Sequence, residues 1–341
     1  MPGLILSNFT HLNKSIKIIL NYILGPVLFL WLAISIYHQL QTQKDLNGAL
    51  QQIKQSVSGE KSWKLMLAGV LMIVNWGIEA RKWQLLVRHL QPVSFLKAYY
   101  SVLSGVAFAI NTPNRIGEYG GRVLYIKDGS RVKAISLAIL GSISQLIVTL
   151  VAGLIGFLYL RNLNIFSTTG SVHPLSTLWL NIILYGVLLV TFFTVLFYFR
   201  ISWLVKWLEK IPGKSKFIQY IKVLDEFETK QLLQVLGLSL TRYLVFVSQY
   251  LLLLNVFGVE IEWWQGFWVI SVLFQILAII PTFALAELGI RGKVSIFLLA
   301  SFSNNYVGII SCTVGIWIIN LVVPALIGSL LILGVKIFSN K

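Results

Sequence analysis

The sequence predicts an all-α polytopic membrane protein with six full transmembrane helices and two re-entrant helical hairpins that form an inverted repeat. Hydrophobic residues make up 57% of the 341-residue chain. Charged residues make up 12%, about half of the roughly 25% found in soluble domains. The mean hydropathy is +0.79. We therefore expect a single membrane domain over residues 1–341.

Six apolar segments are long enough to cross a membrane, for which a helix needs about 20 residues. They are residues 18–37, 63–82, 133–160, 178–199, 233–257 and 306–335. The first is too long for the hydrophobic region of a cleavable signal peptide and is expected to be an uncleaved span. Two polar segments, 39–62 and 200–230, are expected to be amphipathic and to lie on the membrane surface, the second with seven Lys or Arg residues.

Basic residues indicate the orientation. The chain has 28 Lys and Arg against 12 Asp and Glu, a net charge of +16. In a soluble protein this excess would favour nucleic-acid binding, but in a membrane protein it marks cytoplasmic loops, so no nucleic-acid partner is expected. With both termini and residues 81–97, 127–133 and 200–230 in the cytoplasm, 18 basic residues lie inside and five outside.

This orientation makes two segments re-entrant hairpins. Residues 95–131 enter from the cytoplasm and return to it, and residues 263–304 enter from outside and return there. Hairpins of opposite orientation are typical of an inverted repeat. Both segments contain the pattern Glu-x-Gly-x-Arg, at 118–122 and at 287–291, after an upstream proline, Pro113 or Pro281.

The charges of this repeated pattern are the candidate binding groups. Glu118 and Arg122 share a helical face, as do Glu287 and Arg291, so each pair can form a salt bridge. A charge at membrane depth costs at least about 2.5 kcal/mol and persists mainly when it is paired or faces a cavity. We expect Arg115, Arg122 and Arg291 to bind a lipid phosphate. Glu118 and Glu287 would orient these arginines or exchange protons. The pairs could instead be purely structural.

The hairpin breaks are expected to shape this site. Thr112 and Pro113 resemble the start of a helix, so a half-helix would begin near mid-membrane and present its N-terminus to the phosphate. Pro113 and Pro281 would break the hairpins. Four glycines would allow close packing and leave room for a head group: Gly117, Gly120, Gly121 and Gly289.

Other polar residues of the apolar segments have ordinary structural explanations. Arg242 is expected to extend to the membrane surface, and Glu79 to form an interfacial cluster with Arg81 and Lys82. Gln145, Gln249 and Gln275 would hydrogen-bond between helices, with a substrate path as the alternative, and Cys312 would pack in the core. One Cys and four scattered His provide no metal-binding pattern, and no P-loop is present, so we expect no catalytic residue, metal or cofactor.

The run from Pro113 to Glu118, followed by Arg122, is similar to the Pro-x-Arg-x-Gly-Glu signature of the lysylphosphatidylglycerol synthase transmembrane-region family. This family includes the flippase-like membrane half of the bacterial multiple peptide resistance factor. Residues 79–83 resemble the Arg-Trp position of that family, and the resemblance covers about residues 15–335. Two features depart from the family pattern: Glu287 precedes the arginine of the second motif, and Ser144 and Gln145 stand where many relatives carry charges.

The resemblance implies a lipid-handling domain in the bacterial cytoplasmic membrane. We expect it to bind, and to flip between leaflets, an anionic or polyprenyl-phosphate-linked lipid. Two alternatives remain: a membrane enzyme that transfers a group onto a lipid, and a scaffold for a lipid-modifying transferase partner. The chain ends at Lys341, just past its last span, so the soluble aminoacyl-transferase domain of larger members, and with it synthase activity, is not expected. The sequence leaves the lipid, the energy source and the oligomeric state open.

Overall fold

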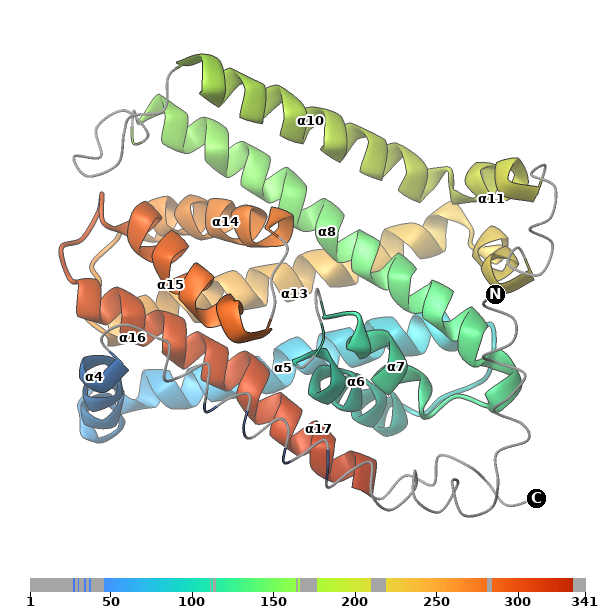
Figure 1. The fold of residues 1–341 in the computed structure, drawn as a ribbon, viewed down its shortest axis with the longest axis horizontal. Helices are drawn as coiled ribbons and strands as arrows, with labels where there is room; N and C mark the ends of the chain where they lie inside the picture. The colour runs from blue at the N-terminus through green and yellow to red at the C-terminus, as the bar shows by residue number, and fades with distance from the viewer. Residues whose placement is uncertain are drawn as a thin grey trace.

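The computed structural model describes residues 46–110, 112, 115–163, 165, 177–209, 219–280 and 284–333, with residues 27, 30, 34 and 37. All regular structure in these residues is helical. Most of the predicted span 18–37, Pro113 and Pro281 lie outside the described residues. Figure 1 shows two sets of long helices that cross the molecule along different diagonals, with several short helices between them.

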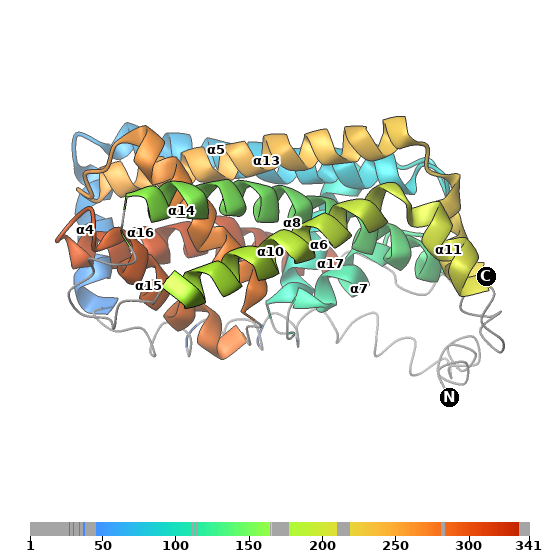
Figure 2. The ribbon, with the colours of Figure 1, turned by 90° about the horizontal axis from the view of Figure 1, so that it is seen from above.

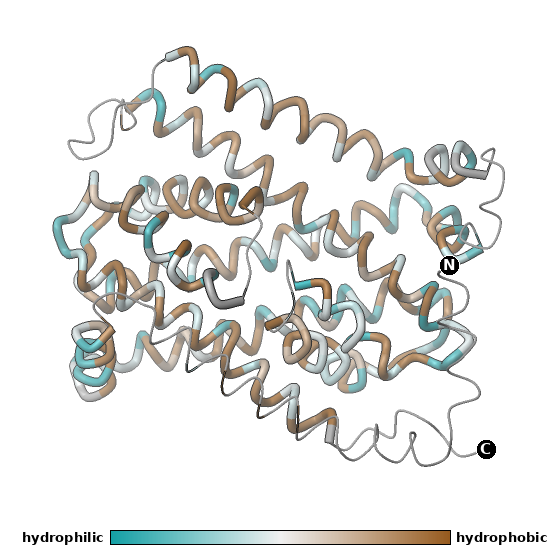
Figure 3. The backbone as a smooth tube through the Cα atoms, viewed as in Figure 1, coloured by the Kyte–Doolittle hydropathy of each residue, from teal (hydrophilic) through white to brown (hydrophobic). Residues whose placement is uncertain are grey.

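Five helical stretches of the described residues are long and apolar enough to cross a membrane. They are α5 (Ser62–Val87), α8 (Arg131–Asn162), α10 (Thr177–Phe199), α13 (Thr229–Val256), and a continuous stretch formed by α16 (Tyr306–Trp317), a π-helical turn (Ile318–Val322) and α17 (Val323–Leu333). Each matches a predicted span, and the chain is a multi-pass membrane protein. Figure 3 shows their lengths coloured mainly as hydrophobic.

Two pairs of short helices occupy the predicted hairpin segments. The first pair is α6 (Phe95–Ala109) and α7 (Gly117–Val123), and the second is α14 (Trp263–Ile279) and α15 (Ala284–Leu299). The two members of each pair contact one another. Ser94 caps the start of α6, since its hydroxyl accepts a hydrogen bond from the Lys97 backbone N–H at 3.3 Å.

The amphipathic segments form short helices at opposite ends of the long ones. Helix α4 (Leu46–Ser58) lies within the predicted segment 39–62, and α11 (Ile201–Glu209) within 200–230. Figures 1 and 2 show them at the two ends of the bundle. Trp203 and Trp207 on α11 are exposed, as expected for a helix whose aromatic side chains enter a membrane interface.

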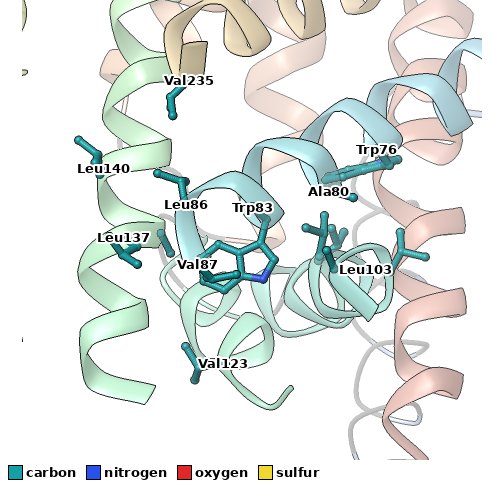
Figure 4. Packing of buried hydrophobic residues seen from close by; sticks show 14 of the residues in the cluster. Trp76, Ala80, Trp83, Leu86, Val87, Leu103, Val123, Leu137, Leu140 and Val235 are labelled. Atoms are coloured by element: carbon teal, nitrogen blue, oxygen red, sulfur yellow. The ribbon is translucent and has the colours of Figure 1, made fainter. Parts of the chain in front are cut away.

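Two buried apolar clusters form the core, and each draws residues from both halves of the chain. The first gathers residues of α5, α6, α7 and α8 with α17, and the second residues of α13, α14, α15 and α16 with α8. Figure 4 shows Trp83, which is fully buried, among Leu86, Val87 and Val123. The polar face of α5 lies directly beside this cluster.

Glycines let the two halves of the chain, α5–α8 and α13–α17, pack against each other in a reciprocal way. Helix α17 from the second half packs on α6 of the first, and α8 from the first half packs on α14 of the second. A Cβ on Gly328 of α17 would overlap the carbonyl oxygen of Leu103 in α6, and a Cβ on Gly153 of α8 would overlap the side chain of Gln275 in α14. A long helix thus approaches a short helix of the other half in both places.

The expected helix-to-helix hydrogen bonds are present for all three glutamines; that of Gln145, with Arg242, is described with the site below. Gln249 donates to the carbonyl of Ala68 at 2.7 Å, and Gln275 to the carbonyl of Leu150 at 3.3 Å. Asn320, in the π-helical turn, donates to Gln249 at 2.8 Å. Cys312 is buried in the core, as predicted. These contacts are structural.

Candidate functional site

The site begins on α5, which presents charged residues one turn apart. Glu79 and Lys82 are each 2% exposed, and the Glu79 carboxylate lies 2.8 Å from the Lys82 ammonium. Lys82 also donates to the Gly141 carbonyl at 3.2 Å and to the Ser239 hydroxyl at 3.3 Å. The prediction of an interfacial cluster at Glu79 is therefore wrong for these two residues, because neighbouring helices cover this face of α5. Of the three residues of the predicted cluster, Arg81 alone is exposed.

The Glu79 carboxylate joins three helices. One oxygen accepts from Arg122 of α7 at 2.8 Å, and the other lies 3.4 Å from Arg242 of α13. Trp83 and Trp76 of α5 lie under these guanidinium groups, with ring centroids 5.7 Å from Arg122 and 5.1 Å from Arg242. A carboxylate surrounded by three cations satisfies the requirement that buried charges be paired.

Helix α7 holds Arg122 against this carboxylate. Arg122 also pairs with Glu118, one turn earlier, as the motif predicts. Gly121 makes the position possible, since a Cβ there would lie 2.7 Å from the Gly105 Cα of α6. The Ser101 hydroxyl of α6 donates to the Arg122 carbonyl at 2.6 Å. Helix α6 therefore supports Arg122 by a hydrogen bond to the backbone carbonyl of the arginine.

A second ion cluster links the two motifs. Arg115 of the first motif lies 2.6 Å from the carboxylate of Glu287, and Arg291 lies 3.2 Å from the same carboxylate. Arg115 therefore has a partner in the other motif, 172 residues away. Its backbone has φ of +57°, a left-handed conformation that costs a non-glycine residue about 1–2 kcal/mol. The fold maintains a strained residue at this contact.

A cavity of about 450 Å³ lies between α8, α13, α14 and α15; the second ion cluster lines it directly, and the first reaches it through Arg242. Its charged lining residues are Arg115, Arg242, Arg291 and Glu287, and its uncharged polar ones are Gln145, Thr149 and Tyr243. Gln145 accepts from Arg242 at 3.4 Å, so it bonds between helices and lines the cavity as well. The described clusters hold five cationic side chains against three carboxylates, an excess of two positive charges.

The structure separates the three predicted phosphate ligands. Arg115 and Arg291 line the cavity, whereas Arg122 is 4% exposed at its side chain, contacts Glu79 and Glu118, and is not among the described residues that line it. Arg122 is therefore paired with two carboxylates and lies apart from the described lining of the cavity. The cause is Glu79, whose contribution to the site the sequence analysis missed.

Arg242 is the cavity residue that sequence reasoning misjudged. The prediction that it extends to the membrane surface is wrong, because it lies at the middle of α13 and its side chain is only 21% exposed. A signal was available on the partner helix: Asn75, Glu79 and Lys82 share one face of α5 by their spacing. A polar stripe on one long helix predicts a polar partner on another.

The start of the first half-helix differs from the prediction. Helix α7 begins at Gly117, later than Pro113, because the Thr112 hydroxyl bonds back to the carbonyls of Phe108 and Ala109 at 3.2 Å and accepts the Gly117 N–H at 2.8 Å. Thr112 thus joins the end of α6 to the start of α7.

The four predicted glycines fall into two groups. Gly117 and Gly121 pack closely against α6, as expected. At Gly120 and Gly289 a Cβ would meet no atom of the described residues within 4 Å, so close packing is not seen there among these residues.

Fold and site together define a multi-pass helical membrane protein with a positively charged cavity between its helices. The family model described as the lysylphosphatidylglycerol synthase TM region matches residues 18–328. The chain belongs to this family, as its first motif predicts. A comparison with curated protein sequences gives no match. Among the described residues, no group of three His, Cys, Asp or Glu is placed to hold a metal ion.

Proposed function

We propose that the protein binds the phosphate of an anionic or polyprenyl-phosphate-linked lipid in this cavity and moves the lipid between leaflets. The observation that carries the proposal is the lining itself, in which Arg115, Arg242 and Arg291 face a single carboxylate, Glu287. Glu79, outside the lining, pairs with Arg242, and the two ion clusters together still carry five cations against three carboxylates. Such an excess among apolar helices favours an anionic ligand because unpaired charges at membrane depth are costly.

The chemistry of the lining suits a phosphate. A guanidinium group binds phosphate oxygens through two parallel hydrogen bonds. The Nε atoms of Arg242 and Arg291 are buried and have no hydrogen-bond partner among the described residues. Both arginines therefore have a donor left after their ion pairs with Glu79 and Glu287 are formed.

Reciprocal packing supports transport by an inverted repeat of two re-entrant hairpins. In this proposal α5–α8 corresponds to α13–α17, and the pairs α6–α7 and α14–α15 are the hairpins. Helix α5 packs along α13. The long helix that ends each half packs on the first hairpin helix of the other half, α8 on α14 and α17 on α6. Motion of one half against the other would open the cavity to each leaflet in turn. Both termini would lie in the cytoplasm of a bacterial cell.

Reconstitution tests the proposal. The purified protein would be placed in liposomes that contain fluorescent phosphatidylglycerol, and transfer between leaflets would be measured. Arg115→Gln and Arg242→Gln should each lower binding and transport about tenfold to a hundredfold, the value of a charge-assisted hydrogen bond. Arg81→Gln, on the exposed face of α5, is the matched control and should behave as wild type.

Other outcomes assign the alternatives. Lipid binding without transport, with a modified lipid detected by mass spectrometry, would favour the group-transfer enzyme. Binding without either would favour a scaffold for a transferase partner. No binding of anionic lipid would refute the proposal and leave the ion pairs as structural contacts.

A further inference from the structure

A second opening lies beside the charged cavity and is almost wholly apolar. It has a volume of about 440 Å³ and lies between α8, α13 and α14. Its rim faces the bilayer, because Val151 and Ile155 of α8 are 40% and 47% exposed and Leu240 and Leu244 of α13 are 48% and 44% exposed. We call it the apolar groove.

The apolar groove adjoins the charged cavity. Tyr243 lines both, and its neighbours Arg242 and Leu244 line one each. On α8, Thr149 lines the cavity and Val148 lines the groove. The same three helices thus present a cationic face and an apolar face side by side, as the binding of an amphiphile requires.

The dimensions of the groove fit a lipid chain. It follows α13 from Leu233 to Leu244, about 16 Å at a rise of 1.5 Å per residue. That length is about half of the roughly 30 Å hydrocarbon thickness of a bilayer, the depth available to one chain in one leaflet. Gly237 widens the groove, since a Cβ at this position would meet no atom within 4 Å among the described residues.

We infer that the apolar groove holds a hydrocarbon chain of the lipid whose phosphate occupies the charged cavity, an inference that rests on the proposed function. The ligand is then a membrane lipid that enters sideways between α8 and α13, and not a soluble phosphate compound. Transfer of a chain from bilayer to groove gains little hydrophobic energy, because both are apolar. The groove acts by giving the chain space while the head group is bound.

A substitution that fills the groove with a large side chain tests the inference. Gly237→Trp places an indole in open space, so the fold should tolerate it. Gly186→Trp is the matched control, because Gly186 also has open space around it, on the lipid-facing helix α10. Two probes of the ligand are needed: phosphatidylglycerol with a diazirine in its acyl chain, for cross-linking in nanodiscs, and glycerol phosphate, which carries the head-group charge without a chain, for calorimetry. Phosphatidylcholine with the same diazirine is the control lipid.

The expected results separate chain from head group. Gly237→Trp should weaken cross-linking of the lipid about tenfold, or about 1.4 kcal/mol, and leave the affinity for glycerol phosphate unchanged, while Gly186→Trp should change neither. Arg242→Gln should reduce labelling of the groove to the level seen with diazirine-tagged phosphatidylcholine, because the head group then no longer holds the chain in place.

Three results would overturn the inference. Equal labelling by both lipids, unaffected by Arg242→Gln, would show that the groove holds ordinary bilayer lipid. Unchanged cross-linking in Gly237→Trp, with head-group binding still lost in Arg242→Gln, would refute the groove and leave the proposed function standing. If the wild-type protein bound neither probe, both proposals would be wrong.

Discussion

Replacing Glu79 with glutamine removes the carboxylate that three buried cations share. Lys82 and Arg122 lie 2.8 Å from it and Arg242 lies 3.4 Å from it. The three cations would not lose the same share of their partners. Arg122 keeps Glu118, and Arg242 keeps Gln145 and the Trp76 ring. Lys82, however, would retain only a carbonyl and a hydroxyl.

The cost of Glu79→Gln is therefore mainly that of one unpaired buried ammonium. Removing one partner of a buried ion pair costs about 3–5 kcal/mol. Because two of the three cations keep other partners, we expect about 3 kcal/mol, a factor of roughly 150 in the folding equilibrium. Glu118→Gln is the control: Glu118 is 22% exposed and its partner Arg122 keeps Glu79, so the cost should be about 1 kcal/mol or less.

A double variant isolates the mechanism. Glu79→Gln with Lys82→Met removes the anion together with the cation that depends on it, and exchanging a buried pair for apolar packing is often neutral or stabilising. The free energy of unfolding should then return toward the wild-type value. It would be measured by SDS titration in mixed micelles with tryptophan fluorescence, since Trp76 and Trp83 adjoin the cluster. The reasoning is refuted if Glu79→Gln costs under 0.5 kcal/mol, or if Lys82→Met adds to its cost.

Two further predictions concern backbone geometry. Gly328→Val should cost about 1–3 kcal/mol, because its Cβ would overlap the Leu103 carbonyl oxygen. Size-exclusion chromatography should show less monodisperse protein than for Gly69→Ala, which adds a Cβ in open space. At Arg115, with φ of +57°, the glycine variant should be about 1 kcal/mol more stable than the alanine variant. Both lose the pair with Glu287, so equal stability in the same titration would contradict backbone strain.

The spans and the intramotif pairs were predictable because they depend on local sequence. Apolar length alone located α8, α10 and α13 within a few residues. Four-residue spacing on a helix was enough to pair Glu118 with Arg122 and Glu287 with Arg291. Both signals act within one helix, where period and length determine the contact.

The centre of the site was not predictable in this way. Arg115 and Glu287 are 172 residues apart, and no local rule brings them together. Arg242 in an apolar segment can point to the membrane surface or into the bundle, and the choice depends on which face α5 covers. Glu79 was misjudged for the same reason, since its position near the end of a span resembles that of an interfacial residue.

The ion pairs that line the cavity also join the two halves of the chain. Arg242 of the second half contacts Glu79 of the first, and Arg115 of the first contacts Glu287 of the second. Relative motion of the halves must break both contacts. Under the proposed function, a phosphate in the cavity competes with these carboxylates for the same guanidinium groups, so binding weakens the links that hold the halves together. A ligand shifts a conformational equilibrium only by its differential affinity for the two states. Here that difference would come from the arginines' exchange of carboxylate for phosphate, without a nucleotide site.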